Sequence, residues 1–215
     1  MKKKIDPNRL IESHRLMQPS KPILCTTKNE DDSDHVAPFS WLIPVSCDPP
    51  RIGLALLSKP KKQHSLVNIE RTGEFVINYP DTSILEKMVE ASYDLRVNEN
   101  KFERSGFKRR ESKKVKPTSI EECKVHLECK VKKIEITGDH SLIIADVLEA
   151  VYDDEAFTED LLVNLEKFEP VIHLKNYCLK DYQTHLFLSP LSTKIIEVEY
   201  PKQKYKEDDY ETKEI

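Results

Sequence analysis

The chain has 215 residues, enough for one domain with a sizeable core and short extensions. Its 34 basic and 38 acidic side chains leave a formal net charge of -4, so no overall field would attract nucleic acid or an anionic membrane. The five cysteines form no C-x-x-C pair, and no apolar run has the length of a membrane span or follows the basic N-terminus as in a secretory signal. We therefore expect a cytoplasmic protein with reduced thiols and no zinc site.

The first third of the chain predicts strands interrupted by prolines. Residues 22–27 read as an apolar strand, and a polar loop follows to residue 34. Residues 35–47 are apolar but contain Pro38 and Pro44, which predicts an irregular or edge strand because proline cannot donate to a ladder. Asp48-Pro49-Pro50 predicts a turn, and residues 51–57 a buried strand.

The middle of the chain predicts short helices around one strand. Residues 63–71 predict a helix that has an apolar face of Leu66, Val67 and Ile69 and ends at Gly73. Residues 74–79 predict a strand. The spacing of Ser83 and Glu86 matches a capping box, which predicts a helix that begins there and extends to about residue 93. Residues 98–106 predict a further short helix or turn.

The last third predicts a hairpin and a charged tail. Residues 125–136 alternate apolar and polar side chains and predict a half-buried strand, which a turn at 137–139 connects to a strand at 141–151. Residues 170–174 predict a last short strand, and the chain after residue 198 is rich in tyrosine and charge. Closely spaced strands with few helices favour an antiparallel barrel, and neither glycine-rich nucleotide loop is present.

Three segments could carry chemistry. Residues 35–50 leave backbone groups outside a ladder and offer Phe39 and Trp41 as apolar contacts for a flat ring with polar edges, although Trp41 could equally be a core residue. Residues 58–65 place hydroxyls and lysines before a helix, which suits a phosphate or a solvated basic loop. His140 opens a strand and could meet a ligand or lie at the surface.

Several motifs occur together in order. They are A-P-F-S-W-L-I-P-V-S-C-D-P-P at 37–50, T-G-E-F-V-I-N at 72–78, K-F at 101–102, S-G-F at 105–107, L-E-C at 127–129 and G-D-H at 138–140. Over about residues 19–177 the chain resembles the flavin reductase-like, FMN-binding split-barrel family. The F-S-W and G-D-H motifs are similar to those of the flavoredoxin-like branch of this family.

This resemblance implies a mainly β fold, a six-stranded antiparallel split barrel with a Greek-key path. It implies a barrel domain at 19–180 between an N-terminal arm at 1–18 and a C-terminal extension at 181–215, charged after residue 200. It also implies a homodimer with FMN near the interface. The predicted cofactor-binding residues are His35, Phe39, Ser40, Trp41, Val45, Ser46, Cys47, Lys62, His64, Ser65, Lys101, His140 and Tyr177.

The sequence departs from the family pattern in three places. His35 stands where an asparagine near the flavin is usual, the loop at 30–34 is acidic and lacks glycine, and Ala145 replaces a common glycine. The acidic loop would disfavour an anionic reduced flavin. The change at His35 leaves open how the flavin edge is bonded.

The function implied is an FMN flavoprotein that reduces flavin with NAD(P)H or transfers electrons from a redox protein, and the short basic loop fits a monophosphate better than FAD. The flavin would perform the redox step, so we expect no catalytic side chain and no metal. One alternative is an FMN carrier or sensor without turnover, and another is a protein that kept the fold and lost the ligand. The basic run at 108–116 is interpreted as a solvated face, so no nucleic-acid or membrane partner is expected.

Overall fold

The first four strands form both edges of one antiparallel sheet. In the computed structural model, which describes residues 1–94, 99–175, 184–188 and 195–199, β1 (Ile23–Lys28) pairs with β2 (Asp34–Phe39), and β3 (Leu42–Cys47) pairs with β4 (Pro50–Leu57). β2 and β3 are the two edge strands, and each contains one of the prolines that the sequence analysis assigned to an edge.

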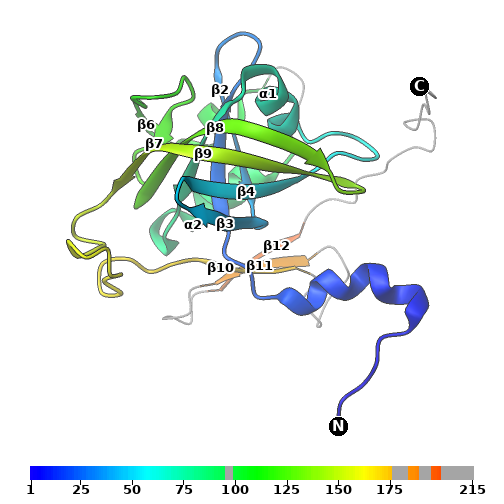
Figure 1. Ribbon diagram of the computed structural model, residues 1–215. Coiled ribbons are helices and arrows are strands. Elements are labelled where there is room, and N and C mark those ends of the chain that lie inside the picture. Colours follow the sequence, from blue (N-terminus) through cyan, green and yellow to red (C-terminus); the bar gives the residue numbers. More distant parts are fainter. Residues whose placement is uncertain (95–98, 176–183, 189–194, 200–215) are drawn as a thin grey trace.

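Three longer-range strands complete this sheet. They are β5 (Glu74–Tyr79), β8 (Val125–Ile136) and β9 (His140–Tyr152), and the order is β2-β1-β5-β8-β9-β4-β3. Only Ser40 and Trp41 separate the two edge strands in sequence. The ends of β2 and β3 therefore lie within about 11 Å of each other. A seven-stranded sheet whose edges meet must curl on itself, and Figure 1 shows this barrel-like shape.

The predicted mainly β class and the antiparallel barrel are confirmed, with seven strands in the main sheet in place of six. Strands at 22–27, 51–57 and 74–79 and the hairpin at 125–151 lie within one or two residues of their predicted bounds. The expected single irregular strand at 35–47 is two strands, because the chain leaves one edge of the sheet at Ser40 and enters the other at Leu42.

The helices are short and follow local signals. α1 (His64–Thr72) ends at Gly73, which has the left-handed φ of 70° that favours glycine. It buries Leu66 and Ile69, whereas Val67, predicted on the same face, is exposed.

The predicted start of the next helix was wrong. The cap is Asp81, whose carboxylate accepts from the Ser83 backbone N–H, and a 3₁₀ turn, η2 (Thr82–Ile84), precedes α2 (Leu85–Ser92). Ser83 itself lies inside that turn, so the capping-box spacing was coincidental. α3 (Lys101–Ser105) is capped by Asn100, whose side chain accepts from two backbone N–H groups of the first turn.

β8 was expected to be half-buried, but both of its faces are covered in its first half. His126 and Glu128 lie on the face opposite the barrel interior and are buried. A segment with the two-stranded ribbon β6 (Arg109–Arg110) and β7 (Ser119–Ile120) covers them. The Glu128 carboxylate accepts from the backbone N–H groups of Lys113 and Lys114. Part of the predicted basic face is therefore tied to the sheet by its backbone.

Two apolar cores lie on opposite sides of the sheet strands. One fills the barrel and includes Cys25, Leu54, Phe75 and Ile143. The other lies beneath α2 and α3 and includes Leu24, Met88, Phe102 and Ile120. Consecutive residues of β1 therefore face different cores, as the period of two in a strand requires.

The two ends of the chain add structure that the sequence analysis did not predict. An 11-residue 3₁₀ helix, η1 (Pro7–Met17), projects from the body (Figure 1). A three-stranded sheet has the order β10 (Ile172–Lys175), β11 (Thr184–Leu188) and β12 (Ile195–Glu199), of which only β10 corresponds to a predicted strand. The tail from residue 200 lies outside the described residues. None of the helices described here has the length and apolarity needed to span a membrane.

Candidate flavin site

Four polar residues from three elements converge at one end of the barrel. His35 comes from the start of β2, His64 and Ser65 from the first turn of α1, and Lys101 from the start of α3. The His35 and His64 rings lie 4.5 Å apart between centroids. The charge of Lys101 lies close enough to lower the pKa of both histidines. We call His35, His64, Ser65 and Lys101 the anion cluster.

The anion cluster contains buried polar atoms without partners among the described residues. His35 is 2% exposed and its Nδ1 has no hydrogen-bond partner, and Ser65 is 1% exposed and its Oγ has none. Lys101 is 8% exposed. Unpaired polar atoms in a protein interior cost free energy unless a ligand or water satisfies them. This arrangement fits a bound polar group.

The N-terminus of α1 adds open backbone donors to the cluster. Gln63 occupies the N-cap position but makes no side-chain cap. Its amide oxygen instead accepts from the Leu57 backbone N–H at 2.9 Å, which ties the loop at 58–63 to the end of β4. The first N–H groups of a helix lack intrahelical partners and attract anions.

The electrostatics of the anion cluster favour a negative ligand. Burial lowers the pKa of Lys101 from 10.5 to about 8. Burial, together with His64 and Lys101, lowers the pKa of His35 to about 3, and burial and Lys101 lower the pKa of His64. Full or partial burial and neighbours of the same sign oppose the charged form of each group, and His64 itself lies exposed at the surface. An anion bound among them would reverse that effect.

A hydrogen-bond network fixes the ring of His64. Its Nε2 lies 2.8 Å from the Asn29 side-chain oxygen, which also accepts from the Asn68 amide at 3.0 Å. The Asn29 amide nitrogen donates to Ser33 Oγ at 3.0 Å, so the amide orientation of Asn29 is set from both sides. His64 Nε2 must therefore carry a hydrogen, and Nδ1 is the unprotonated nitrogen of the neutral ring.

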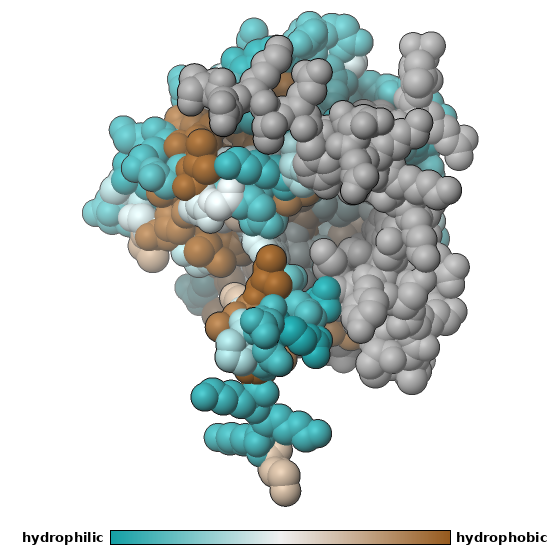
Figure 2. All heavy atoms as spheres, turned by 90° about the vertical axis from the view of Figure 1, so that its right-hand side faces the viewer, coloured by the Kyte–Doolittle hydropathy of each residue, from teal (hydrophilic) through white to brown (hydrophobic). Residues whose placement is uncertain are grey.

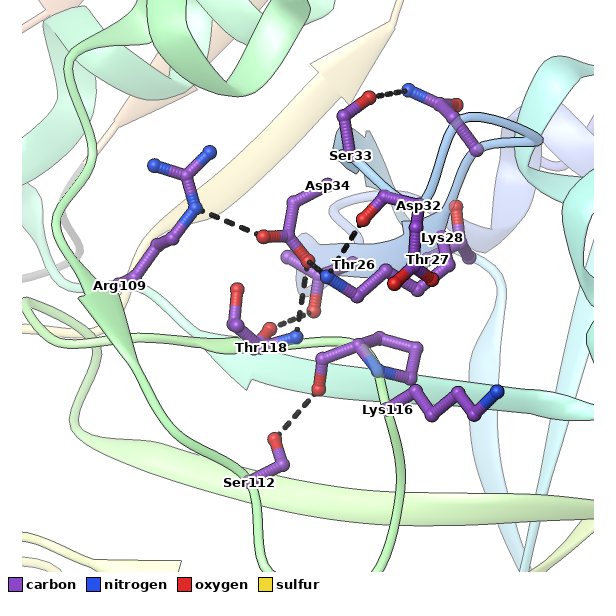
Figure 3. Close-up of polar contacts among 12 residues, drawn as sticks. Thr26, Thr27, Lys28, Asp32, Ser33, Asp34, Arg109, Ser112, Lys116 and Thr118 are labelled. Atoms are coloured by element: carbon purple, nitrogen blue, oxygen red, sulfur yellow. Dashed lines mark hydrogen bonds and ion pairs between the residues drawn. The ribbon is translucent and has the colours of Figure 1, made fainter.

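Asp34, the residue before His35, anchors the start of β2 (Figure 3). Its carboxylate accepts from Arg109 Nε at 2.9 Å and from the Thr118 backbone N–H at 3.2 Å, and it pairs with Lys28 Nζ at 3.1 Å. Burial raises the pKa of Asp34, but these three partners outweigh burial and hold that pKa below its usual value. The network fixes the position from which His35 extends.

Aromatic rings gather where the chain crosses between the sheet edges. Trp41 stacks on His140 with 4.5 Å between ring centroids and 26° between planes. His14 of η1 meets the indole edge-on at 5.9 Å. Trp41 remains 46% exposed. We call His14, Trp41 and His140 the aromatic cluster.

The anion and aromatic clusters lie at the same end of the sheet. His140 pairs with Leu57 at the end of β4, and the Ser58 N–H donates to the Asp139 carbonyl at 2.8 Å. The loop that begins there leads directly to His64. The six-residue loop at 58–63 thus connects the anion cluster to the aromatic cluster.

A family model described as flavin reductase like domain matches residues 17–171, which include every residue of the anion cluster. The chain belongs to this family. An uncharacterized protein of Archaeoglobus fulgidus is 36% identical over 123 residues, which is 57% of this chain and 68% of that protein.

Solved structures of family-like proteins share the fold. Nitrilotriacetate monooxygenase component B from Bacillus cereus superposes with a TM-score of 0.74 at 19% identity and covers 88% of this chain and 96% of its own. Flavoredoxin of Desulfovibrio vulgaris superposes with a TM-score of 0.64 at 19% identity and covers 88% and 93%. The flavin reductase-like assignment made from the motifs is therefore confirmed.

The structure groups six of the predicted site residues into the two clusters. His35, His64, Ser65 and Lys101 form one cluster, and Trp41 and His140 form the other. Phe39 packs against the barrel core, and Ser40 Oγ is hydrogen-bonded to His173 Nδ1 at 2.8 Å.

Four other predicted residues lie apart from both clusters. Lys62 Nζ pairs with Glu70 at the surface. Ser46 lies opposite Arg51, six residues along β4 from Leu57, and is therefore about 20 Å from the His140 end of that strand. Val45 and Cys47 are its exposed neighbours. Tyr177 lies outside the described residues.

Sequence reasoning missed three residues of this region. The sequence analysis predicted no helix or strand in the N-terminal arm that contains His14. It described the loop that contains Asn29 only as polar and acidic. His173 lies in the strand predicted at 170–174, where no site residue was expected, and its backbone pairs with Ser20. None of the three has a local pattern that indicates a ligand contact, because the contacts that bring each of them into this region are made with residues distant in sequence.

Proposed function

We propose that this chain binds FMN at the anion and aromatic clusters and works as a flavin reductase-like or flavoredoxin-like electron-transfer protein. The observation that supports this most is that His35 Nδ1 and Ser65 Oγ are buried without a hydrogen-bond partner among the described residues, while the buried Lys101 acts electrostatically on the His35 ring. A folded protein rarely leaves such polar atoms unsatisfied without a ligand to meet them.

The anion cluster fits a phosphate group. Ser65 Oγ, the open N–H groups of α1 and Lys101 Nζ would hold its oxygens, and charge-assisted hydrogen bonds of this kind are the strong ones. A single such cluster supports one phosphate, which favours FMN over FAD. The four-residue convergence also explains why a lysine with so low a pKa is kept in a buried position.

The aromatic cluster fits the flavin ring. Trp41 offers an exposed indole face, and His140 stacks on that indole and donates from Nδ1 to Asp139 at 2.8 Å. Next to them the chain crosses between two sheet edges, where backbone groups are not all used in ladders. Such a surface offers apolar contact for the faces of a ring and polar contact for its edge.

Bound FMN would supply the redox chemistry, with NAD(P)H or a redox protein as electron donor. The protein residues would bind and orient the cofactor: Ser65 and Lys101 at its phosphate end, Trp41 and His140 at its ring. None of these side chains needs to act as an acid or base, and among the described residues no group of three His, Cys, Asp or Glu side chains could hold a metal ion.

We also propose that two copies associate through the outer face of β3. Ile43 and Val45 are 57% and 41% exposed there. They lie over Gly53, where an added Cβ would come within 3.0 Å of Val45 Cγ1. Figure 2 shows apolar side chains at the surface on the side of the sheet that faces forward in Figure 1. Light scattering after gel filtration should give a dimer mass, and Ile43→Lys should give a monomer mass. A wild-type monomer would overturn this.

A visible spectrum tests FMN binding directly. Flavin bands that stay with the protein through gel filtration, after FMN is added, support the proposal. FMN that elutes only with small molecules overturns it. Single variants Ser65→Ala and Lys101→Met should weaken FMN binding more than riboflavin binding, because riboflavin lacks the phosphate. Lys113→Met, which removes an exposed lysine whose ammonium lies 4.0 Å from Glu149 of β9, is the matched control.

Turnover separates the two roles that an FMN site could serve. Steady-state oxidation of NADH and NADPH with FMN in excess should exceed the rate without protein if the chain is a reductase. An FMN complex that oxidises neither donor would identify a carrier or sensor, or a protein reduced by a redox partner.

A further inference from the structure

The histidine pair distinguishes this anion cluster from one made only of fixed donors. A neutral imidazole donates from one nitrogen and accepts at the other. The neutral ring of His64 uses its only N–H, at Nε2, to bond Asn29. His64 therefore has no hydrogen left for an anion unless the ring gains a proton at Nδ1. The Asn68 amide donates to the same Asn29 oxygen at 3.0 Å and so keeps this acceptor turned toward His64, where an unprotonated Nε2 would have no donor to bond.

The surroundings of the pair keep both rings neutral when no anion is present. His35, from β2, faces His64 of α1 and Lys101 of α3, and both oppose its protonation. Arg71 of α1 also lowers the pKa of His64, whereas the carboxylate of Glu30 in the β1–β2 loop raises it. The nearby carboxylate of Asp34 is engaged by Arg109 and Lys28. Positive groups therefore outnumber uncommitted negative ones around the two rings.

We infer that the anion cluster binds a phosphate monoester together with one proton, which is taken up from solvent by the His35–His64 pair. This inference rests on the proposed function, since the phosphate is taken to be that of FMN. A dianion placed beside the rings stabilises an imidazolium, and the new N–H can then donate to a phosphate oxygen. No covalent bond changes, and the imidazole nitrogen is the proton acceptor.

Proton uptake makes affinity depend on pH. For each proton taken up on binding, the association constant falls about tenfold per unit rise in pH. Lys101, with a pKa of about 8, already holds its proton for the most part at pH 7. Uptake at pH 7 therefore reports the histidines, whereas Lys101 contributes above pH 8. The phosphate has a second pKa near 6 and is about one-tenth protonated at pH 7, which offsets the similar fraction of Lys101 that is uncharged there, so the net proton uptake at pH 7 reports the pair.

Calorimetry measures this uptake. FMN is titrated into the protein at pH 7 in phosphate-free buffers of different ionisation enthalpy, and the slope of the observed enthalpy against that of the buffer gives the number of protons. We expect close to one proton for FMN and none for riboflavin. His64→Gln preserves a donor toward Asn29 but cannot titrate, and His35→Asn introduces the residue usual in the family. Each should bind FMN with reduced uptake and a flatter pH profile.

The outcomes separate the inference from the proposed function. FMN binding without proton uptake, or uptake unchanged in both variants, overturns the inference and leaves FMN binding intact. Absence of FMN binding at every pH overturns the proposed function. In that case sulfate, a dianion across this range, tests the anion cluster alone through nitrogen NMR of the histidine rings. A His64 pKa raised by sulfate supports proton-coupled anion binding, and an unchanged pKa overturns it.

Discussion

Replacing Lys101 by methionine should stabilise the protein without ligand while it weakens FMN binding. The lysine is 8% exposed, and burial lowers its pKa from 10.5 to about 8. The pKa of Lys101 is lower in the folded protein than in the unfolded chain, so protonated Lys101 makes the folded state less stable. This free-energy penalty is absent above pH 10.5, grows as the pH falls to about 8, and is constant at lower pH. This difference in pKa corresponds to about 3 kcal/mol at pH 7. Methionine has a similar length and no charge to desolvate, so the free energy of unfolding should rise by up to that amount.

The same substitution removes one charge-assisted hydrogen bond to the proposed phosphate. Such bonds contribute about 1.5–3 kcal/mol, so the dissociation constant for FMN should increase about ten- to hundredfold. Opposite effects on stability and binding are the signature of a group kept for its ligand.

Denaturant unfolding of the FMN-free protein at pH 7 and an FMN titration measure the two effects. Lys113→Met provides the control, because Lys113 has an exposed side chain and should change neither quantity by more than about 0.5 kcal/mol. A Lys101→Met protein that is less stable than wild type and binds FMN equally well would refute the reasoning, since Lys101 would then be a structural residue.

Three further predictions concern other parts of the molecule. Burial is the main cause that lowers the pKa of His35 to about 3 and that of His126 to about 4. The free energy of unfolding should therefore be highest above pH 6.5 and should fall as the pH drops toward 4. His126→Gln should make this fall smaller in a plot of unfolding free energy against pH. Trp41 is the single tryptophan of the chain, so its fluorescence should fall on FMN binding and should increase in unliganded His140→Ala, where the stacked ring is lost; emission insensitive to FMN would place the flavin elsewhere. Asp34→Asn leaves Arg109 and Lys28 without their buried carboxylate and should lower the unfolding free energy by about 3 kcal/mol, which a shift of the urea midpoint will show; an unchanged midpoint would contradict the anchoring role.

Several features of the fold could be predicted from local sequence because their causes are local. Gly73 ends α1 since its φ of 70° suits glycine, and the alternation of apolar residues at 125–136 identified β8. The prolines at 38 and 44 indicated edge strands because the missing N–H is tolerated only there. The cap at Ser83 was wrong because Asp81, two residues earlier, caps the turn and accepts from both the backbone N–H and the hydroxyl of Ser83.

The composition of the site was predictable only as a list of residue types. Motif order placed His35, Ser65 and Lys101 near a flavin, and the structure brings them together. It places Ser46 and Cys47 at the other end of β4, since strand register is a property of the paired strands. The role of Asn29 could not be predicted, because it depends on His64 and Asn68 from another element.

By itself the sequence determined the family, the alternation that makes strands, and which ionisable residues are available. Only the tertiary structure decided that a histidine from β2, a histidine from α1 and a lysine from α3 lie close together around one enclosure, where His35 and Lys101 are buried and His64 stays exposed. Their lowered pKa values result from that enclosure, because desolvation and like-charge repulsion arise only when distant segments pack around the same point. A local pattern can specify an imidazole, but the assembled barrel sets its proton affinity.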